Sequence, residues 1–269
     1  MPVEHLEDLA DVRLADYAHL RAPSTRMRLE RERGIFTVEG WRSVEALLAS
    51  PYPVRSVLVT TEQAPRAERL VPPDVAAFAI PAEAVEQVTG VDFHRGVLAV
   101  AVRSELPSVA DVVARATRLL VLEGVNDHEN VGSLFRNAAA FGVDGIVLDP
   151  TTADPLYRRA TRVSLGHVLR IPFARADGGD WPYALDDLRR ARFDTWALTP
   201  AADALPLADA VATAGERVAL LVGAEGPGLS DAALAAATSR VRIPMARGTD
   251  SVNVATAAAV ALSALFGHG

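Results

Sequence analysis

Three stretches of this 269-residue sequence combine residue types that could bind a ligand or transfer a group. Residues 126–142 (NDHENVGSLFRNAAAFG) contain an amide and a guanidinium. Residues 223–234 (GAEGPGLSDAAL) join closely spaced glycines to a carboxylate, and residues 242–258 (RIPMARGTDSVNVATAA) add a hydroxyl and a second amide. Glycines let a backbone approach a ligand closely, while guanidinium, amide and hydroxyl groups can hold a phosphate or align a sugar hydroxyl. Together these types favour a site for a polar substrate.

Each stretch alone also has a purely structural interpretation. Asn130 could cap the helix that it begins, and Arg136 could form a surface ion pair. Ser251 could cap the last helix of the chain. Gly132 and Ala140 lie about one turn on either side of Arg136 and leave room for a bulky partner. That space favours a functional role for Arg136.

The glycine-rich stretch at 223–228 follows an aliphatic run and precedes an alanine-rich segment. This setting is typical of a phosphate or dinucleotide loop, which makes a nucleotide-dependent oxidoreductase an alternative. However, a dinucleotide fingerprint reads G-x-G-x-x-G at a first βα turn, whereas this stretch reads G-x-x-G-x-G and comes late in the chain. The spacing therefore argues against a dinucleotide.

The composition excludes several kinds of chemistry. There is no cysteine, and all 27 basic residues are arginine, which removes cysteine nucleophiles, cysteine-based metal sites, Schiff-base lysines and the P-loop lysine. No metal site is expected. The net charge of −7 argues weakly against nucleic acid, but residues 21–34 hold five arginines against two glutamates. With neither a signal peptide nor a membrane-spanning segment in view, we expect a cytoplasmic protein with no membrane partner.

The chain pattern predicts two α/β parts. Up to about residue 104, short helices (39–50, 81–90) mix with strands (54–60, 96–102), and 105–117 reads as a connector with a short helix. From 118 the pattern alternates regularly, which predicts a mostly parallel sheet covered on both faces. Its strands are expected at 118–125, 144–150, 167–173, 194–200, 217–226 and 241–245, and its helices at 130–141, 181–192, 230–239 and 253–267. The last helix is apolar nearly all round, so it should be buried in the core or in an oligomer interface.

In this order, the three stretches resemble the signature motifs of the SpoU-type (TrmH-like) RNA ribose 2′-O-methyltransferases of the SPOUT superfamily. The first is similar to the family's N-x-G-x-x-x-R motif and the second to G-x-E-G-x-G-L. The third is similar to I-P-M…S-L-N-V, with Val252 in place of the usual leucine and Ala255 in place of a usual serine. The resemblance covers about 118–269. More loosely, residues 1–104 look like the ribosomal-protein-like RNA-binding domain of many members, through FTVEG (36–40) and HRGVLAV (94–100).

The resemblance implies a fold, a reaction and partners. The C-terminal strand and helix would form a deep trefoil knot that binds S-adenosyl-L-methionine, and the protein would act as a homodimer on RNA. The substrate would be ribosomal RNA of the large subunit. Transfer RNA is an alternative within the family, and a catalytically silent RNA-binding or assembly protein is an alternative on the same fold.

The resemblance also assigns site residues. The implied catalytic residues are Arg136, Asn130, Ser251 and Asn253. The implied cofactor-binding residues are Thr199, Gly223, Ala224, Glu225, Gly228, Ile243, Met245 and Val252. The expected RNA-binding residues are Arg26, Arg28, Arg95, Arg136, Arg162 and Ser164. Because arginine is always protonated, Arg136 is better suited to clamping a phosphate or stabilising alkoxide charge than to acting as a base.

Overall fold

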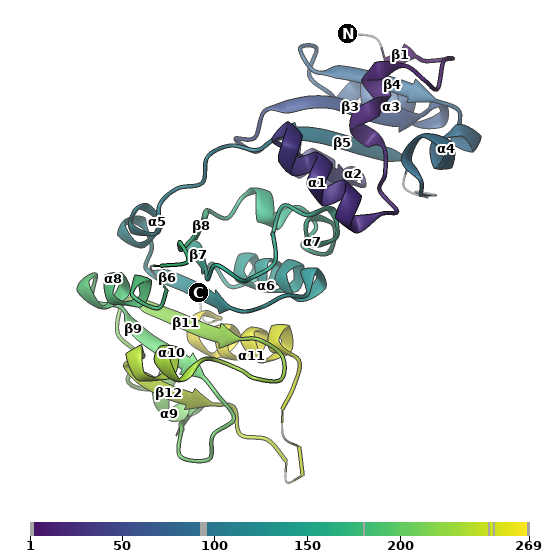
Figure 1. Ribbon diagram of the computed structural model, residues 1–269. Helices are drawn as coiled ribbons and strands as arrows, with labels where there is room; N and C mark the ends of the chain where they lie inside the picture. The colour runs from purple at the N-terminus through teal and green to yellow at the C-terminus, as the bar shows by residue number, and fades with distance from the viewer. Residues whose placement is uncertain (1–2, 92–95, 180, 247, 250, 268–269) are drawn as a thin grey trace. The chain divides into compact units, whose positions relative to one another are not determined.

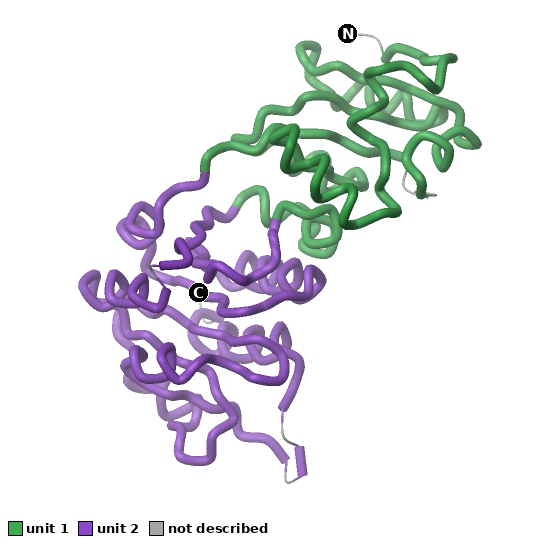
Figure 2. The backbone as a smooth tube through the Cα atoms, viewed as in Figure 1, with its two compact units in different colours: residues 1–105, 156–170 green, residues 106–155, 171–269 purple. Residues whose placement is uncertain are grey.

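The computed structural model describes residues 3–91, 96–179, 181–246, 248–249 and 251–267. The chain forms two compact units (Figure 2). Unit 1 consists of residues 1–105 and 156–170, and unit 2 consists of residues 106–155 and 171–269. None of the described helices is long and apolar enough to cross a membrane.

Unit 1 is built on a five-stranded mixed sheet in the order β1-β4-β3-β5-β2. Strand β3 pairs parallel with β4 and antiparallel with β5, which in turn pairs antiparallel with β2. The strands are β1 (Glu4–His5), β2 (Ile35–Glu39), β3 (Val54–Thr60), β4 (Ala76–Ile80) and β5 (Val97–Val102). The α-helices are α1 (Pro23–Arg33), α2 (Trp41–Leu48), α3 (Ala64–Leu70), α4 (Val85–Thr89) and α7 (Arg158–Val163).

The segment 156–170 joins unit 1 although it lies far along the sequence. Helix α7 packs against β2, and Arg158 forms an ion pair with Glu39 at the end of that strand. The hydroxyl of Ser43 in α2 donates to the carbonyl of Thr161 over 3.4 Å. The boundaries expected from the sequence placed this segment in the second domain.

Unit 2 carries a seven-stranded sheet in the order β10-β12-β9-β11-β6-β7-β8, and every recorded strand pair is parallel. The mostly parallel α/β sheet expected from the alternating pattern is therefore confirmed. The strands are β6 (Arg118–Glu123), β7 (Gly145–Leu148), β8 (Phe173–Arg175), β9 (Asp194–Leu198), β10 (Leu205–Pro206), β11 (Val218–Gly223) and β12 (Ser239–Arg242).

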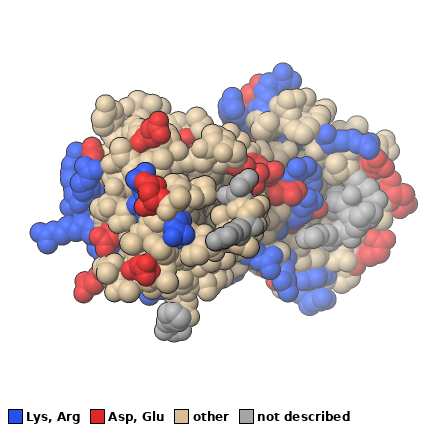
Figure 3. Space-filling view, turned by 90° about the horizontal axis from the view of Figure 1, so that it is seen from below, with Lys and Arg blue, Asp and Glu red and all other residues tan. Residues whose placement is uncertain are grey.

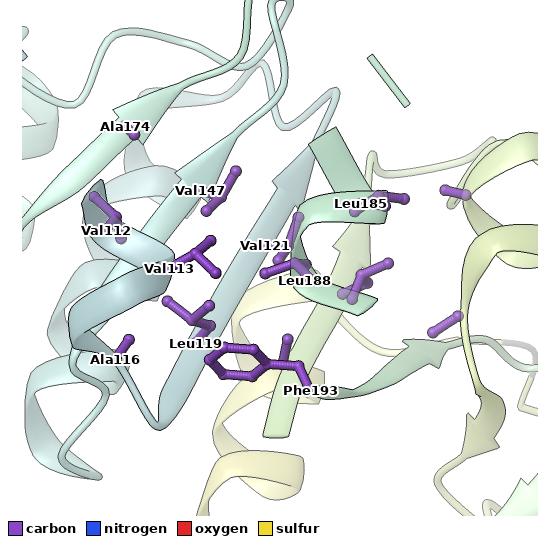
Figure 4. Close-up of a cluster of buried hydrophobic side chains, with 14 of the residues drawn as sticks. Val112, Val113, Ala116, Leu119, Val121, Val147, Ala174, Leu185, Leu188 and Phe193 are labelled. Atoms are coloured by element: carbon purple, nitrogen blue, oxygen red, sulfur yellow. The ribbon is translucent and has the colours of Figure 1, made fainter. Parts of the chain in front are cut away.

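Helices cover both faces of this sheet. On one face, α5 (Val109–Arg115), α8 (Ala184–Arg190) and α10 (Asp231–Ala236) enclose the core drawn in Figure 4, where Leu119 and Val121 point away from the strand toward Val113 and Leu188. On the other, α6 (His128–Ala140) and α11 (Val254–Phe266) pack against each other, and α9 (Leu207–Val211) contacts α11 (Figure 1). The alternation of strand side chains between faces explains why both layers are apolar.

Two expected strands differ from the structure. The strand expected at 167–173 is a short 3-10 turn at His167–Leu169, and the strand begins only at Phe173, because a short apolar run alone does not distinguish the two. The strand expected at 241–245 ends at Arg242, which leaves Ile243 and Met245 in the following loop. The short helix expected in the connector is confirmed as α5, whose Val112 and Val113 are buried in unit 2.

Candidate active site

A cavity of about 360 Å³ opens in unit 2 beyond the carboxyl ends of β9 and β11. This is the edge of a parallel sheet at which ligands usually bind. All eight residues expected to bind the cofactor line the cavity, together with Ser251 and Asn253. The full lining is Leu198, Thr199, Pro200, Val222, Gly223, Ala224, Glu225, Gly226, Gly228, Ile243, Met245, Ser251, Val252, Asn253, Val254 and Ala257.

The glycine loop forms one wall of the cavity through a tight backbone turn. The Gly228 N–H donates to the Ala224 carbonyl over 3.0 Å, and these two residues form an isolated antiparallel bridge. A Cβ atom on Gly223 would lie only 2.2 Å from the Gly228 carbonyl carbon and the Leu229 nitrogen. Gly228 itself has a φ of +74°. Glycine at 223 and 228 is therefore required by the turn, before any ligand is considered.

Three polar side chains from separate elements form a closed hydrogen-bonded ring beside this loop. The Asn130 amide donates to Glu225 Oε1 over 3.0 Å, and the Asn253 amide donates to the same oxygen over 2.9 Å. Asn253 also donates to Asn130 Oδ1 over 2.9 Å. The ring connects the start of α6, the glycine loop and the start of α11. Residues separated by more than 120 positions thus meet at one point.

The capping interactions explain why these amides are available. Asp127 caps α6, accepting hydrogen bonds from the N–H groups of Glu129 and Asn130, so Asn130 is not the cap and its side chain is directed to Glu225. The cap of α11 is Asn253, whose Oδ1 accepts from Ala255 and from the next residue, and not Ser251. Neither Asn130 nor Ser251 is therefore the helix cap that the sequence allowed.

Arg136 lies on α6, six residues beyond Asn130 and so about 9 Å further along the helix axis. Its side chain is exposed and forms no ion pair or hydrogen bond with any residue that the structure describes. The surface ion pair considered from the sequence is absent from this part of the chain. No recorded hydrogen bond connects Arg136 to the ring, so the guanidinium remains available for an external anion.

Asn137, which the sequence analysis missed, also connects the two helices. Its amide donates to the carbonyl of Ala255 in α11 over 2.8 Å. Asn130 and Asn137 are seven residues apart and therefore share one face of α6. That spacing is the signal that could have identified Asn137.

The charge of the cavity favours a cationic ligand. Among the described residues that line it, Glu225 alone carries a charge. Its carboxylate accepts two amide hydrogen bonds through Oε1, which orients the negative charge without neutralising it. A mostly apolar cavity with one oriented carboxylate is complementary to an apolar molecule with a positive centre.

A carboxylate network supports the neighbouring loop after β6. Asp149 accepts hydrogen bonds from the Gly124 N–H and from the hydroxyls of Thr151 and Thr152. Burial raises the pKa of Asp149, but these hydrogen bonds stabilise the carboxylate more, so its pKa lies below the ordinary value of 3.8. The described residues include no group of three His, Cys, Asp or Glu side chains that could hold a metal ion.

Two of the residues expected to contact RNA are buried, and the expectation is corrected for both. Arg26 is 1% exposed; its guanidinium bonds Glu30, the Asp16 carbonyl and the Thr37 hydroxyl. Ser164 is fully buried and donates to the Thr161 carbonyl. Glu30, one turn away on α1, supplies the buried partner of the Arg26 guanidinium. The arginine-rich sequence of this helix does not show which of its arginines faces inward.

The other expected RNA contacts have different surroundings. Arg28 is exposed, with Glu32 at 3.9 Å, so it is accessible to a phosphate. Arg162 is half-buried and lies 3.6 Å from Glu39 in unit 1. Arg95 lies outside the described residues. Figure 3 shows one face on which basic side chains gather in separate clusters, with acidic and uncharged residues between them.

Comparisons with known proteins agree with this geometry. The family model for the SpoU rRNA Methylase family matches residues 117–263. The chain is 46% identical over 267 residues to an uncharacterized tRNA/rRNA methyltransferase of Mycobacterium tuberculosis, covering 97% of this chain and 91% of that protein. It is 26% identical over 269 residues to the 23S rRNA guanosine-2′-O-methyltransferase RlmP of Bacillus subtilis, covering 98% of this chain and 100% of the relative.

Solved structures of methyltransferases are also similar to this chain. An AdoMet-bound rRNA methyltransferase from Sinorhizobium meliloti superposes with a TM-score of 0.82 at 25% identity, over 100% of this chain and 99% of that one. The AdoMet-bound SpoU methyltransferase AviRb from Streptomyces viridochromogenes superposes with a TM-score of 0.78 at 22% identity, over 95% of this chain and 98% of that one. At that identity the second match supports the fold alone.

Proposed function

Because this chain belongs to the SpoU rRNA Methylase family, we propose that it transfers a methyl group from S-adenosyl-L-methionine to a ribose 2′-hydroxyl of RNA. The observation that carries the proposal is the ring of Asn130, Glu225 and Asn253 at the mouth of the cavity. All three are family-motif residues, and they converge from distant segments on the residues expected to hold the methyl donor, of which Glu225 is one.

The cavity fits the methyl donor in size and chemistry. Its volume of about 360 Å³ falls within the range of ordinary small-molecule sites. The backbone at Gly223, Ile243 and Val252 would hold the adenosyl part, and Thr199 and Met245 would form the walls. Glu225 would attract the sulfonium. When bound, the donor supplies an activated methyl group, so the protein needs only to align the acceptor hydroxyl.

Arg136 and the amides would then prepare the acceptor. The exposed Arg136 guanidinium is suited to hold the RNA phosphate next to the reacting ribose, or to stabilise negative charge on the 2′-oxygen as its proton leaves. Asn130 would orient the ribose, while Ser251 and Asn253 would support the wall nearest the methyl group. Arginine is not proposed as the base, because a guanidinium keeps its proton and has no free lone pair to accept another.

We propose ribosomal RNA of the large subunit as the substrate, since RlmP is named as a 23S rRNA methyltransferase and aligns over its entire length. Transfer RNA is the second candidate, because the 46% identical relative is named as a tRNA/rRNA methyltransferase. A silent RNA-binding protein on this fold is disfavoured by the retained ring and Arg136. A ribosomal substrate also makes the cytoplasm the proposed compartment.

Three further features are proposed from the family resemblance. Residues 118–269 would be the methyltransferase domain, with a trefoil knot formed by its C-terminal segment. The enzyme would be a homodimer through this domain. Residues 1–104 would bind RNA, with the exposed Arg28 among the phosphate contacts.

Incubating the purified protein with methyl-labelled S-adenosylmethionine and ribosomal RNA tests the proposal. We expect label in alkali-resistant dinucleotides, because 2′-O-methylation blocks cleavage of the adjacent phosphodiester bond. Arg136→Ala should lower transfer about 100-fold with unchanged donor binding. Arg115→Ala, which removes an exposed arginine at the end of α5 on the opposite face of the sheet, is the matched control and should leave transfer unchanged. Label in bases, or full activity of Arg136→Ala, would contradict the proposal.

A further inference from the structure

Glu123 is a buried carboxylate that the proposed chemistry does not use. It is the last residue of β6 and is 8% exposed. Its carboxylate accepts three hydrogen bonds: from Trp181 Nε1 at 2.7 Å, from the Ser230 hydroxyl at 2.8 Å and from the Ser230 N–H at 2.8 Å. Burying a carboxylate is costly unless such donors satisfy it. Two of the three belong to the residue that follows the glycine loop.

Glu123 is therefore connected to both ends of that loop. Its backbone is the register partner of Gly223, where the loop begins, and its side chain holds Ser230, where the loop ends. Ser230 in turn caps α10 by accepting from the Ala233 N–H over 3.1 Å. A single residue thus determines the separation of the loop's two ends and connects the loop to a helix.

The loop is too tight to absorb a displacement at one end. Gly223 lies against the backbone of Gly228 and Leu229, so that even a methyl group would not fit between them. A shift of Ser230 must therefore move Gly223 or the tip of the loop. That tip carries Glu225, whose carboxylate lies in the cavity wall and in the ring of amides.

We infer that Glu123 is a positioning residue for the methyl-donor site, acting through Ser230 to fix the glycine loop and the Glu225 carboxylate. This inference rests on the proposed function, because it assigns the loop to the methyl donor. Glu123 does not itself line the cavity. Its contribution should therefore show as weaker donor binding and not as a loss of a reacting group.

The matched control is Asp144, which also accepts three hydrogen bonds: from the Thr117 N–H, the Thr117 hydroxyl and the Arg118 N–H. It lies at the opposite end of β6, one strand length or about 17 Å away. Glu123→Gln and Asp144→Asn each replace one carboxylate by an amide of the same shape. Both substitutions should lower the melting temperature, but only Glu123→Gln removes an interaction with the glycine loop.

Calorimetry with S-adenosylmethionine separates an effect on the glycine loop from a general loss of stability. We expect Glu123→Gln to raise the Kd about tenfold, while Asp144→Asn stays within about twofold of the unaltered protein. With RNA as the varied substrate, the KM should be unchanged in both. Equal weakening in the two variants, or no weakening in Glu123→Gln, overturns the inference.

A double variant tests whether Glu123 acts through Ser230. Ser230→Ala removes the hydroxyl bond to Glu123 but keeps the backbone N–H bond, so it should weaken donor binding in the same direction. Adding Glu123→Gln to it should cause a smaller fold-change than Glu123→Gln causes alone, because the two changes share the hydroxyl bond. If the two fold-changes multiply instead, Glu123 acts by another route and the inference fails. If the unaltered protein does not bind S-adenosylmethionine at all, the proposed function fails, which is a distinct result.

Discussion

At the scale of single residues, Glu225 determines the electrostatic character of the site. It lies at the tip of the glycine loop, and its Oε1 accepts from two amides that arrive from α6 and α11. An exposed carboxylate contributes modestly because water and salt screen its charge. Since it is the one charged side chain in the described cavity lining, it should nevertheless distinguish a cationic ligand from a neutral ligand of similar shape.

Glu225→Gln should reduce the preference for S-adenosylmethionine over neutral S-adenosylhomocysteine by about threefold to tenfold. The glutamine oxygen can still accept the two amide hydrogen bonds, so the loop should keep its shape. Calorimetry gives the Kd of each ligand, and the ratio of the two Kd values measures the preference. Raising the salt concentration should reduce this preference in the unaltered protein. An unchanged ratio would show that Glu225 does not sense the sulfonium charge.

At the scale of elements, the glycine loop depends on the absence of a side chain at 223. Gly223→Ala places a Cβ 2.2 Å from the backbone of Gly228 and Leu229, so the loop must open. We expect loss of detectable donor binding and a clear drop in thermal stability. Gly178→Ala is the control, because its added Cβ meets nothing within 4 Å. Normal donor binding by Gly223→Ala would contradict the described turn.

The loop after β6 depends on the ionisation of Asp149. Its pKa is below 3.8 in the folded protein, so the unfolded state binds more protons in acid and stability rises with pH in this range. The contribution of Asp149 is present above the ordinary value of 3.8 and is lost as the pH falls through its lower folded value.

Asp149→Asn should therefore be less stable than the unaltered protein at pH 7, and its disadvantage should shrink on acidification below about pH 4. Urea unfolding at the two pH values measures this difference. An equal disadvantage at both pH values would show that the amide loses hydrogen bonds only, with no contribution from the charge.

The parallel sheet of unit 2 was predictable because its strands alternate with helices along the sequence. The motif residues could also be assigned to one site by resemblance. Their contacts could not be predicted, because hydrogen bonds between Asn130 and Asn253 depend on how α6 and α11 pack, and periodicity does not specify packing partners. The same limit explains Arg26: an arginine in a charged helix gives no sequence signal of burial.

At the scale of the whole molecule, α11 combines a buried face with one exposed apolar side chain. Ala258, Ala261 and Leu262 are buried, whereas Val260 is 43% exposed. The sequence predicted burial of this helix in the core or in an oligomer interface; the structure buries one face in unit 2, and the proposed homodimer would cover Val260.

Light scattering should give twice the mass of one chain, and Val260→Asp should shift the protein toward the monomer, because it places a charge in the proposed interface. Val12→Asp is a suitable control: Val12 is 83% exposed in unit 1, so the same charge should not change the mass. A monomer before any substitution would exclude the proposed homodimer. An unchanged mass in Val260→Asp would exclude this part of α11 from the interface.

Methylation of a ribose 2′-hydroxyl of ribosomal RNA can be observed in cells. The most direct test is to map 2′-O-methyl groups across the RNA of cells that lack the gene, and of the same cells carrying the unaltered gene or Arg136→Ala. We predict that one large-subunit site loses its methyl group in the deletion, regains it with the unaltered gene and stays unmethylated with Arg136→Ala. An identical methylation map in all three strains would contradict the claim.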